Sequence, residues 1–71
     1  MIITRGQKLT IVSGRKGTFN ALAIGTFNTD TDEFADVAVD QAKPVQGMAQ
    51  DWGKGERIPI RCSDAKFTLR N

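Results

Sequence analysis

The chain has 71 residues, a net charge of +2, a single cysteine and no histidine. A chain this short buries only about 60% of its unfolded surface, so we expect one domain over residues 1–71 with a thin core. The counts exclude an internal disulfide, a cysteine–histidine zinc site and any catalytic group built on imidazole. The sequence therefore predicts no enzyme, no metal site and no cofactor.

Short alternating apolar runs, separated by glycines and polar turns, predict an all-β fold. In chain order we expect strands at 7–12, 18–27, 34–41, 56–62 and 66–70. The side chains expected to face the core are Leu9, Ile11, Leu22, Ile24, Ala35, Val37, Val39, Ile58, Ile60, Phe67 and Leu69. Five short strands in so small a chain predict a small, SH3-like antiparallel β-barrel, because closure removes exposed strand edges.

Glycine and proline add detail to these strands. Gly25 predicts a bend or bulge in the second strand. Pro59 predicts that its strand lies at an edge or donates nothing at that position, because proline cannot donate to a ladder. Residues 28–33 form a polar turn. Residues 42–55 predict a long loop with one short strand near Val45, and Cys62 is expected to be a half-buried strand residue.

The opening segment predicts a β-hairpin whose turn, residues 13–17, carries Arg15 and Lys16 between two glycines. One interpretation is a phosphate site, formed by the N–H groups of the glycine turn and the two cations. The other is a solvated hairpin tip that charge keeps soluble. Arg5 and Lys8 lie close in sequence and have the same sign, which favours the phosphate interpretation.

This segment also resembles the KOW motif of ribosomal proteins and transcription elongation factors. The residues in comparable places are Gly6, Leu9, Ile11, Ser13, Gly14, Lys16, Gly17 and Leu22. The turn is one residue shorter than in the motif, and Asn20 stands where a glycine is usual. The resemblance, which covers residues 4–22, implies an SH3-like barrel that contacts RNA, DNA or the machinery that handles them, without catalytic residues.

Charge is unevenly distributed along the chain. Residues 1–29 contain four cations and no acid, residues 30–42 contain five acids and no cation, and residues 43–71 contain six cations and three acids. Lys54, Arg57 and Arg61 form a second basic set, and Trp52 lies nearby in sequence. Trp52 could stack a nucleobase beside these cations, or it could close one end of the barrel as a core residue.

Two further sets of side chains leave alternatives open. Phe19 and Phe27 could serve as stacking platforms if they point outward, or they could pack in the core. The acids of residues 30–36 lack the glycine and terminal glutamate of a calcium loop, so a solvated hairpin loop is expected. These acids could also orient the cationic face toward a polyanion, or meet a basic partner.

Together these patterns predict a binding protein that contacts nucleic acid, RNA or DNA, or a nucleoprotein machine through a basic surface. The residues expected at that surface are Arg5, Lys8, Arg15, Lys16, Lys54, Arg57 and Arg61. Binding would depend on phosphate neutralisation, so it would be sensitive to salt and only weakly specific for sequence.

A rival hypothesis is a protein-interaction or accessory regulatory module that docks through the loop from Pro44 to Gly55. Trp52 and Met48 would be its anchors, because interface energy concentrates in a few large side chains. A homo-oligomer whose interface compensates for the thin core is also open. No segment resembles a signal peptide or a membrane helix, and an unpaired thiol fits a reducing compartment, so a cytoplasmic location is expected.

Overall fold

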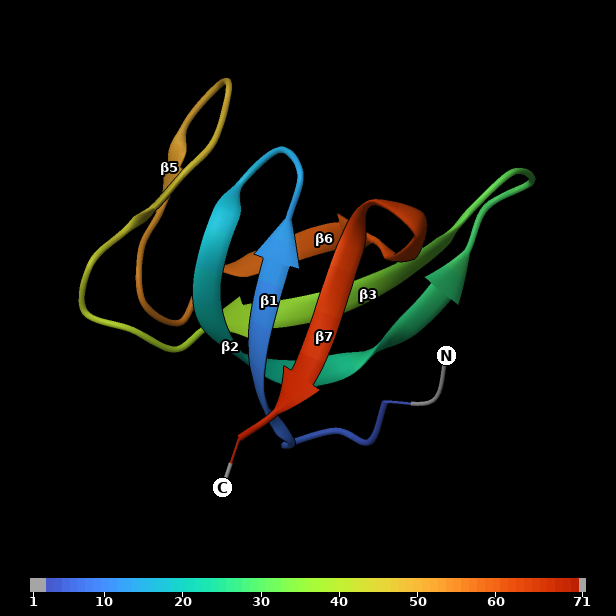
Figure 1. Ribbon diagram of the computed structural model, residues 1–71, viewed down its shortest axis with the longest axis horizontal. Coiled ribbons are helices and arrows are strands. Elements are labelled where there is room, and N and C mark those ends of the chain that lie inside the picture. The colour runs from blue at the N-terminus through green and yellow to red at the C-terminus, as the bar shows by residue number, and fades with distance from the viewer. Residues whose placement is uncertain (1–2, 71) are drawn as a thin grey trace.

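The computed structural model describes residues 3–70 and shows an all-β architecture (Figure 1). The main sheet is antiparallel and contains β1 (Lys8–Ser13), β2 (Gly17–Asn28), β3 (Glu33–Val39), β6 (Arg57–Arg61) and β7 (Ala65–Leu69). A separate pair is formed by β4 (Val45–Gln46) and β5 (Asp51–Trp52), and a short 3-10 helix, η1 (Cys62–Asp64), links β6 to β7. The five predicted strands and the short strand at Val45 are confirmed, whereas β5 was not predicted.

The sheet curves strongly but does not close into a barrel. Its strand order is β6-β3-β2-β1-β7, so β6 and β7 are both edges. The Val39 N–H donates to the Glu56 carbonyl (2.9 Å), and alternation along the ladder then places the Pro59 nitrogen on the open edge. The predicted edge position of Pro59 is confirmed. Because proline has no N–H, β6 lacks the central donor that a ladder with β7 would require.

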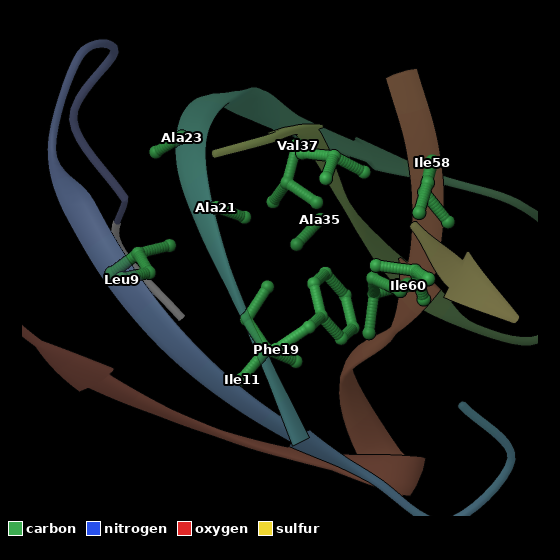
Figure 2. Packing of buried hydrophobic residues seen from close by; sticks show 11 residues of the cluster. Leu9, Ile11, Phe19, Ala21, Ala23, Ala35, Val37, Ile58 and Ile60 are labelled. Atoms are coloured by element: carbon green, nitrogen blue, oxygen red, sulfur yellow. The ribbon is translucent and has the colours of Figure 1, made fainter. Parts of the chain in front are cut away.

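The core lies inside the curve of the sheet (Figure 2). Its buried apolar residues are Leu9, Ile11, Phe19, Ala21, Ala23, Ala35, Val37, Val39, Val45, Ile58 and Ile60. The predicted inward faces of β1, β3 and β6 are confirmed. Each of these strands alternates strictly between buried and accessible positions at its centre, as expected for a sheet with one solvated face.

The predicted inward face of β2 is wrong. Leu22 and Ile24 are only half-buried, and the alternate set that begins at Phe19 faces the core instead. The turn pairs Ser13 with Gly17, which places Phe19 directly opposite Ile11. Opposite residues in a ladder share a face, so the register carries Phe19 inward with Ile11.

Other positions refine the prediction. The register between β2 and β3 shifts between Ala23 and Gly25, which confirms the predicted bulge, and β2 bends through this region (Figure 1). Leu69 was expected in the core but is 64% exposed, because it lies near the end of an edge strand. Cys62 is half-buried as predicted, although it lies in η1 and not in a strand.

Arg70 fastens the end of β7 to the rest of the sheet. Its Nε donates to the Leu9 carbonyl (2.9 Å), and its Nη2 donates to the Ala21 carbonyl and to Asp40 Oδ2 (3.1 Å each). One side chain thus joins β1, β2 and the end of β3. Across residues 3–70 there is no helix long and apolar enough to cross a bilayer.

Candidate functional site

The tip of the β1–β2 hairpin holds Arg15 and Lys16 in a well-defined loop. The backbone N–H groups of both residues donate to the Oγ of Ser13, at 3.2 Å each. The Gly14 N–H donates to the Asp64 carbonyl at 3.0 Å, which ties the tip to η1. Gly17 ends the loop with φ +73°, a conformation that favours glycine.

These hydrogen bonds correct one part of the predicted phosphate site. The turn amides were expected to face an anion, but those of Gly14, Arg15 and Lys16 are used within the protein. An anion at the tip would therefore meet the two side-chain charges. Among residues 3–70, no carboxylate lies within ion-pair distance of Arg15 or Lys16.

A cavity of about 80 Å³ separates the tip from β6 and η1, and we call it the Arg61 cavity. Arg15, Lys16 and Arg61 line it together with Phe34 and Asp64. The curvature of the sheet thus brings the end of β6 to the hairpin tip, although the two are far apart in sequence (Figure 1). Three cations surround the cavity, and one of its walls carries a carboxylate.

Arg61 is held in place by two weak contacts. Its Nε lies 3.6 Å from Asp32 Oδ2, and its guanidinium carbon lies 5.6 Å from the centroid of the Phe34 ring. The side chain remains 42% exposed. Both contacts add little to stability at an exposed site. They orient the Arg61 side chain but leave guanidinium N–H groups free to bind a ligand.

A second, larger hollow of about 310 Å³ lies on the other side of the tip, and we call it the Trp52 groove. Arg15 and Lys16 line one side, while residues 47–50 and Trp52 line the other. Trp52 is half-buried and packs against the core, as the core-residue interpretation predicted, but it also lines this groove. Met48 is 97% exposed.

The other predicted site residues lie away from the tip. Arg5 and Lys8 are exposed, and they lie before and at the first residue of β1, which is the end opposite the hairpin tip. Lys8 shares one row of the sheet with Arg57, so these two cations lie toward the same end. Lys54 is in the turn before β6, where Gly55 N–H bonds to the end of β3. The predicted set of seven cations is therefore divided between two regions.

The predicted surface did not include Lys43, which also lies near the tip. Lys43 and Lys16 both border a further hollow. Lys16 also lines the Arg61 cavity and the Trp52 groove. Lys43 lies in the irregular segment after β3, with no strand pattern to place it. Its only sequence signal is its charge.

The aromatic and acidic alternatives are also placed. Phe19 is 3% exposed, which excludes it as a stacking platform. Phe27 is 44% exposed, and its ring stacks on Phe34 with centroids 5.3 Å apart. In the polar turn, Thr29 Oγ1 accepts from the Asp32 N–H (3.1 Å), so the turn is an ordinary side-chain-capped loop. Across residues 3–70, no three His, Cys, Asp or Glu side chains are grouped to hold a metal ion.

The surroundings of Cys62 make its thiol less acidic than usual. Burial raises the pKa of the Cys62 thiol, and the nearby Glu33 carboxylate raises it further by repelling the thiolate. Although Cys62 directly follows Arg61 in sequence, burial and the Glu33 carboxylate determine the direction in which its pKa shifts. The thiol has the character of a structural group.

In comparisons with known proteins, no family model, no curated protein and no solved structure matched the chain. We call the β1–β2 hairpin tip, together with the Arg61 cavity and the Trp52 groove, the hairpin end.

Proposed function

We propose that this protein is a small non-catalytic binding domain that contacts nucleic acid, or an assembly containing it, through its hairpin end. The observation that carries the proposal is the position of Arg15 and Lys16. Both are free of ion pairs within residues 3–70, and both lie between the Arg61 cavity and the Trp52 groove. Cations beside a hollow that contains an aromatic side chain suit a polymer of phosphates and bases.

Two further features support the proposal. Arg61 and Lys43 add positive charge on either side of the tip, so a chain of phosphates could meet several cations in succession. The resemblance of residues 4–22 to the KOW motif points to the same class of ligand. We expect a smaller contribution to ligand binding from the four cations that lie away from the hairpin tip, Arg5, Lys8, Lys54 and Arg57.

The test compares two double variants that remove the same charge from opposite ends of β1. Arg15→Ala with Lys16→Ala should reduce the slope of log affinity against log salt by about 1.4 to 1.8, since two phosphate contacts are lost. Arg5→Ala with Lys8→Ala should change it by less than half as much. The six residues of β1 separate the two ends by about 17 Å, beyond the screening length of about 8–10 Å.

Fluorescence anisotropy with a labelled oligonucleotide, titrated at several salt concentrations, measures both slopes. Equal effects of the two double variants would show that only net charge matters, and would overturn the assignment to the hairpin end. Circular dichroism provides the control that both variants remain folded.

A second candidate function is protein binding through the loop from Pro44 to Gly55. The exposure of Met48 next to Ala49 and Trp52 favours it, because contiguous exposed apolar surface marks interaction sites. If this alternative is correct, the protein passes through a heparin column at moderate salt. It also retains a protein partner, and Met48→Ala abolishes that retention. Light scattering on the same sample would reveal a homo-oligomer.

A further inference from the structure

We propose that the ligand is single-stranded nucleic acid and that one of its bases enters the Trp52 groove while the adjoining phosphates contact Arg15 and Lys16. This inference rests on the proposed function and narrows it from any nucleic acid to an unpaired strand. It also assigns separate roles to the two sides of the groove, one for the base and one for the backbone.

The first support is the size and lining of the Trp52 groove. Its volume of about 310 Å³ lies near the lower limit of ligand pockets, about 300 Å³, so it suits one nucleoside. One side is apolar, with Met48, Ala49 and Trp52, and the other carries two cations. A nucleotide has the same division, because its flat base adjoins a charged phosphate.

The second support is that the indole is fixed before any ligand arrives. Trp52 pairs with Val45 across β4 and β5, and it packs against the core. The Gly47 N–H donates to the Gln50 carbonyl (3.0 Å), which closes the turn between β4 and β5 next to the indole. A Cβ on Gly47 would lie 2.8 Å from the Trp52 Nε1, so the glycine allows the turn to approach the ring. A rigid ring loses little entropy when a base stacks on it.

The third support is Met48, the most exposed large apolar side chain among residues 3–70. A flexible thioether makes favourable contacts with aromatic rings, and Met48 lines the groove in which the base would lie. A duplex could not use this groove, because its bases are stacked on each other and their faces are covered. For a nucleic-acid ligand, this apolar wall can therefore contact a base only where the strand is unpaired.

The experiment uses Trp52 as its own probe, because it is the only tryptophan in the chain. Intrinsic fluorescence and anisotropy are measured with an oligonucleotide as single-stranded DNA and as RNA, with the corresponding DNA duplex, and with heparin. We expect both single strands to quench Trp52 and to bind at least about ten-fold more tightly than the duplex. Heparin should bind without quenching.

Variants separate the base from the backbone. Met48→Ala should weaken single-strand binding about five-fold, near the lower end of the loss seen when a stacking partner is removed, and should leave heparin binding unchanged. Leu69→Ala, at an exposed apolar residue of β7, is the matched control and should change neither.

Two results would overturn this inference in distinguishable ways. If duplex, heparin and single strands bind equally and Trp52 fluorescence does not change, the base site is wrong while the proposed function stands. If none of these polyanions binds at moderate salt, the proposed function fails and this inference fails with it.

Discussion

The two ends of β1 carry similar numbers of basic side chains but place them in different surroundings. At the hairpin end, Arg15 and Lys16 have no carboxylate partner among residues 3–70, and both border the Arg61 cavity and the Trp52 groove. At the other end, Arg70 is surrounded by two backbone carbonyls and the Asp40 carboxylate. Charge count alone does not separate these regions, and ion pairing does not either, because Arg5 and Lys8 also have no carboxylate partner among residues 3–70. What separates them is the fully engaged Arg70 at one end and the hollows beside Arg15 and Lys16 at the other.

Arg70 and Arg61 show the same contrast within one residue type. Each has one aspartate partner, but the Arg70 side chain is 25% exposed with an N–O distance of 3.1 Å, and Arg61 is 42% exposed with a distance of 3.6 Å. A guanidinium held by several acceptors is used for stability, because its donors are satisfied. One that keeps its donors free remains available to a ligand.

The largest expected effect tests this contrast directly. Arg70→Ala should lower the free energy of unfolding by about 2 kcal/mol, because it removes three charge-assisted hydrogen bonds from a partly buried site. Arg61→Ala should lower it by less than about 1 kcal/mol, as expected for an exposed pair. Urea unfolding measures both values. Equal losses would contradict the division into a structural and an available arginine.

The fold was largely predictable because alternation is a local signal. Ile58 and Ile60, separated by Pro59, reveal both an inward face and an edge position. The face of β2 was mistaken because Leu22 and Ile24 are larger than the alanines that are buried. Residue size favoured burial of Leu22 and Ile24, whereas the register set by the hairpin turn buries the alternate set that begins at Phe19. Closure of the barrel depends on curvature and edge donors, which no periodicity encodes.

The candidate site was only partly predictable because proximity in sequence is not proximity in a strand. Lys8 and Arg15 are close in sequence, but an extended chain advances about 3.3 Å per residue and separates them by the length of β1. Arg61 reaches the tip through the curvature of the sheet. Lys43 lies in an irregular loop, where no pattern could indicate its position.

A second prediction sharpens the contrast by testing how rigid the hairpin end is. Gly47→Ala should lower the free energy of unfolding by about 1–2 kcal/mol, because its Cβ would lie 2.6 Å from the Gln50 carbonyl and the backbone of the turn must move. Native Trp52 emission should shift as well, since the same Cβ presses on the indole. Urea unfolding and fluorescence spectra measure the two effects.

Gly14→Ala provides the matched control on the other side of the tip. Its Cβ would meet Asp64 Oδ1 at 2.7 Å, but a carboxylate can rotate away. We therefore expect a loss below about 0.5 kcal/mol, typical of a surface substitution, and unchanged emission. Similar behaviour of the two variants would show that the turn at Gly47 is not fixed, and would remove the preorganised wall from the Trp52 groove.

The smallest expected effect concerns the reactivity of Cys62, which tests whether the positive charge of the hairpin end reaches this half-buried thiol. Burial, reinforced by Glu33, raises the pKa of Cys62, so its stabilising contribution is complete below the ordinary thiol pKa and is lost as pH rises through the raised value. At pH 8.5, iodoacetamide should alkylate the native thiol more slowly than the urea-unfolded one. Glu33→Gln should speed native alkylation by lowering the pKa. If the native thiol is alkylated as fast as the unfolded one, the positive charge of Arg61 and its neighbours offsets the effect of burial on the pKa of Cys62.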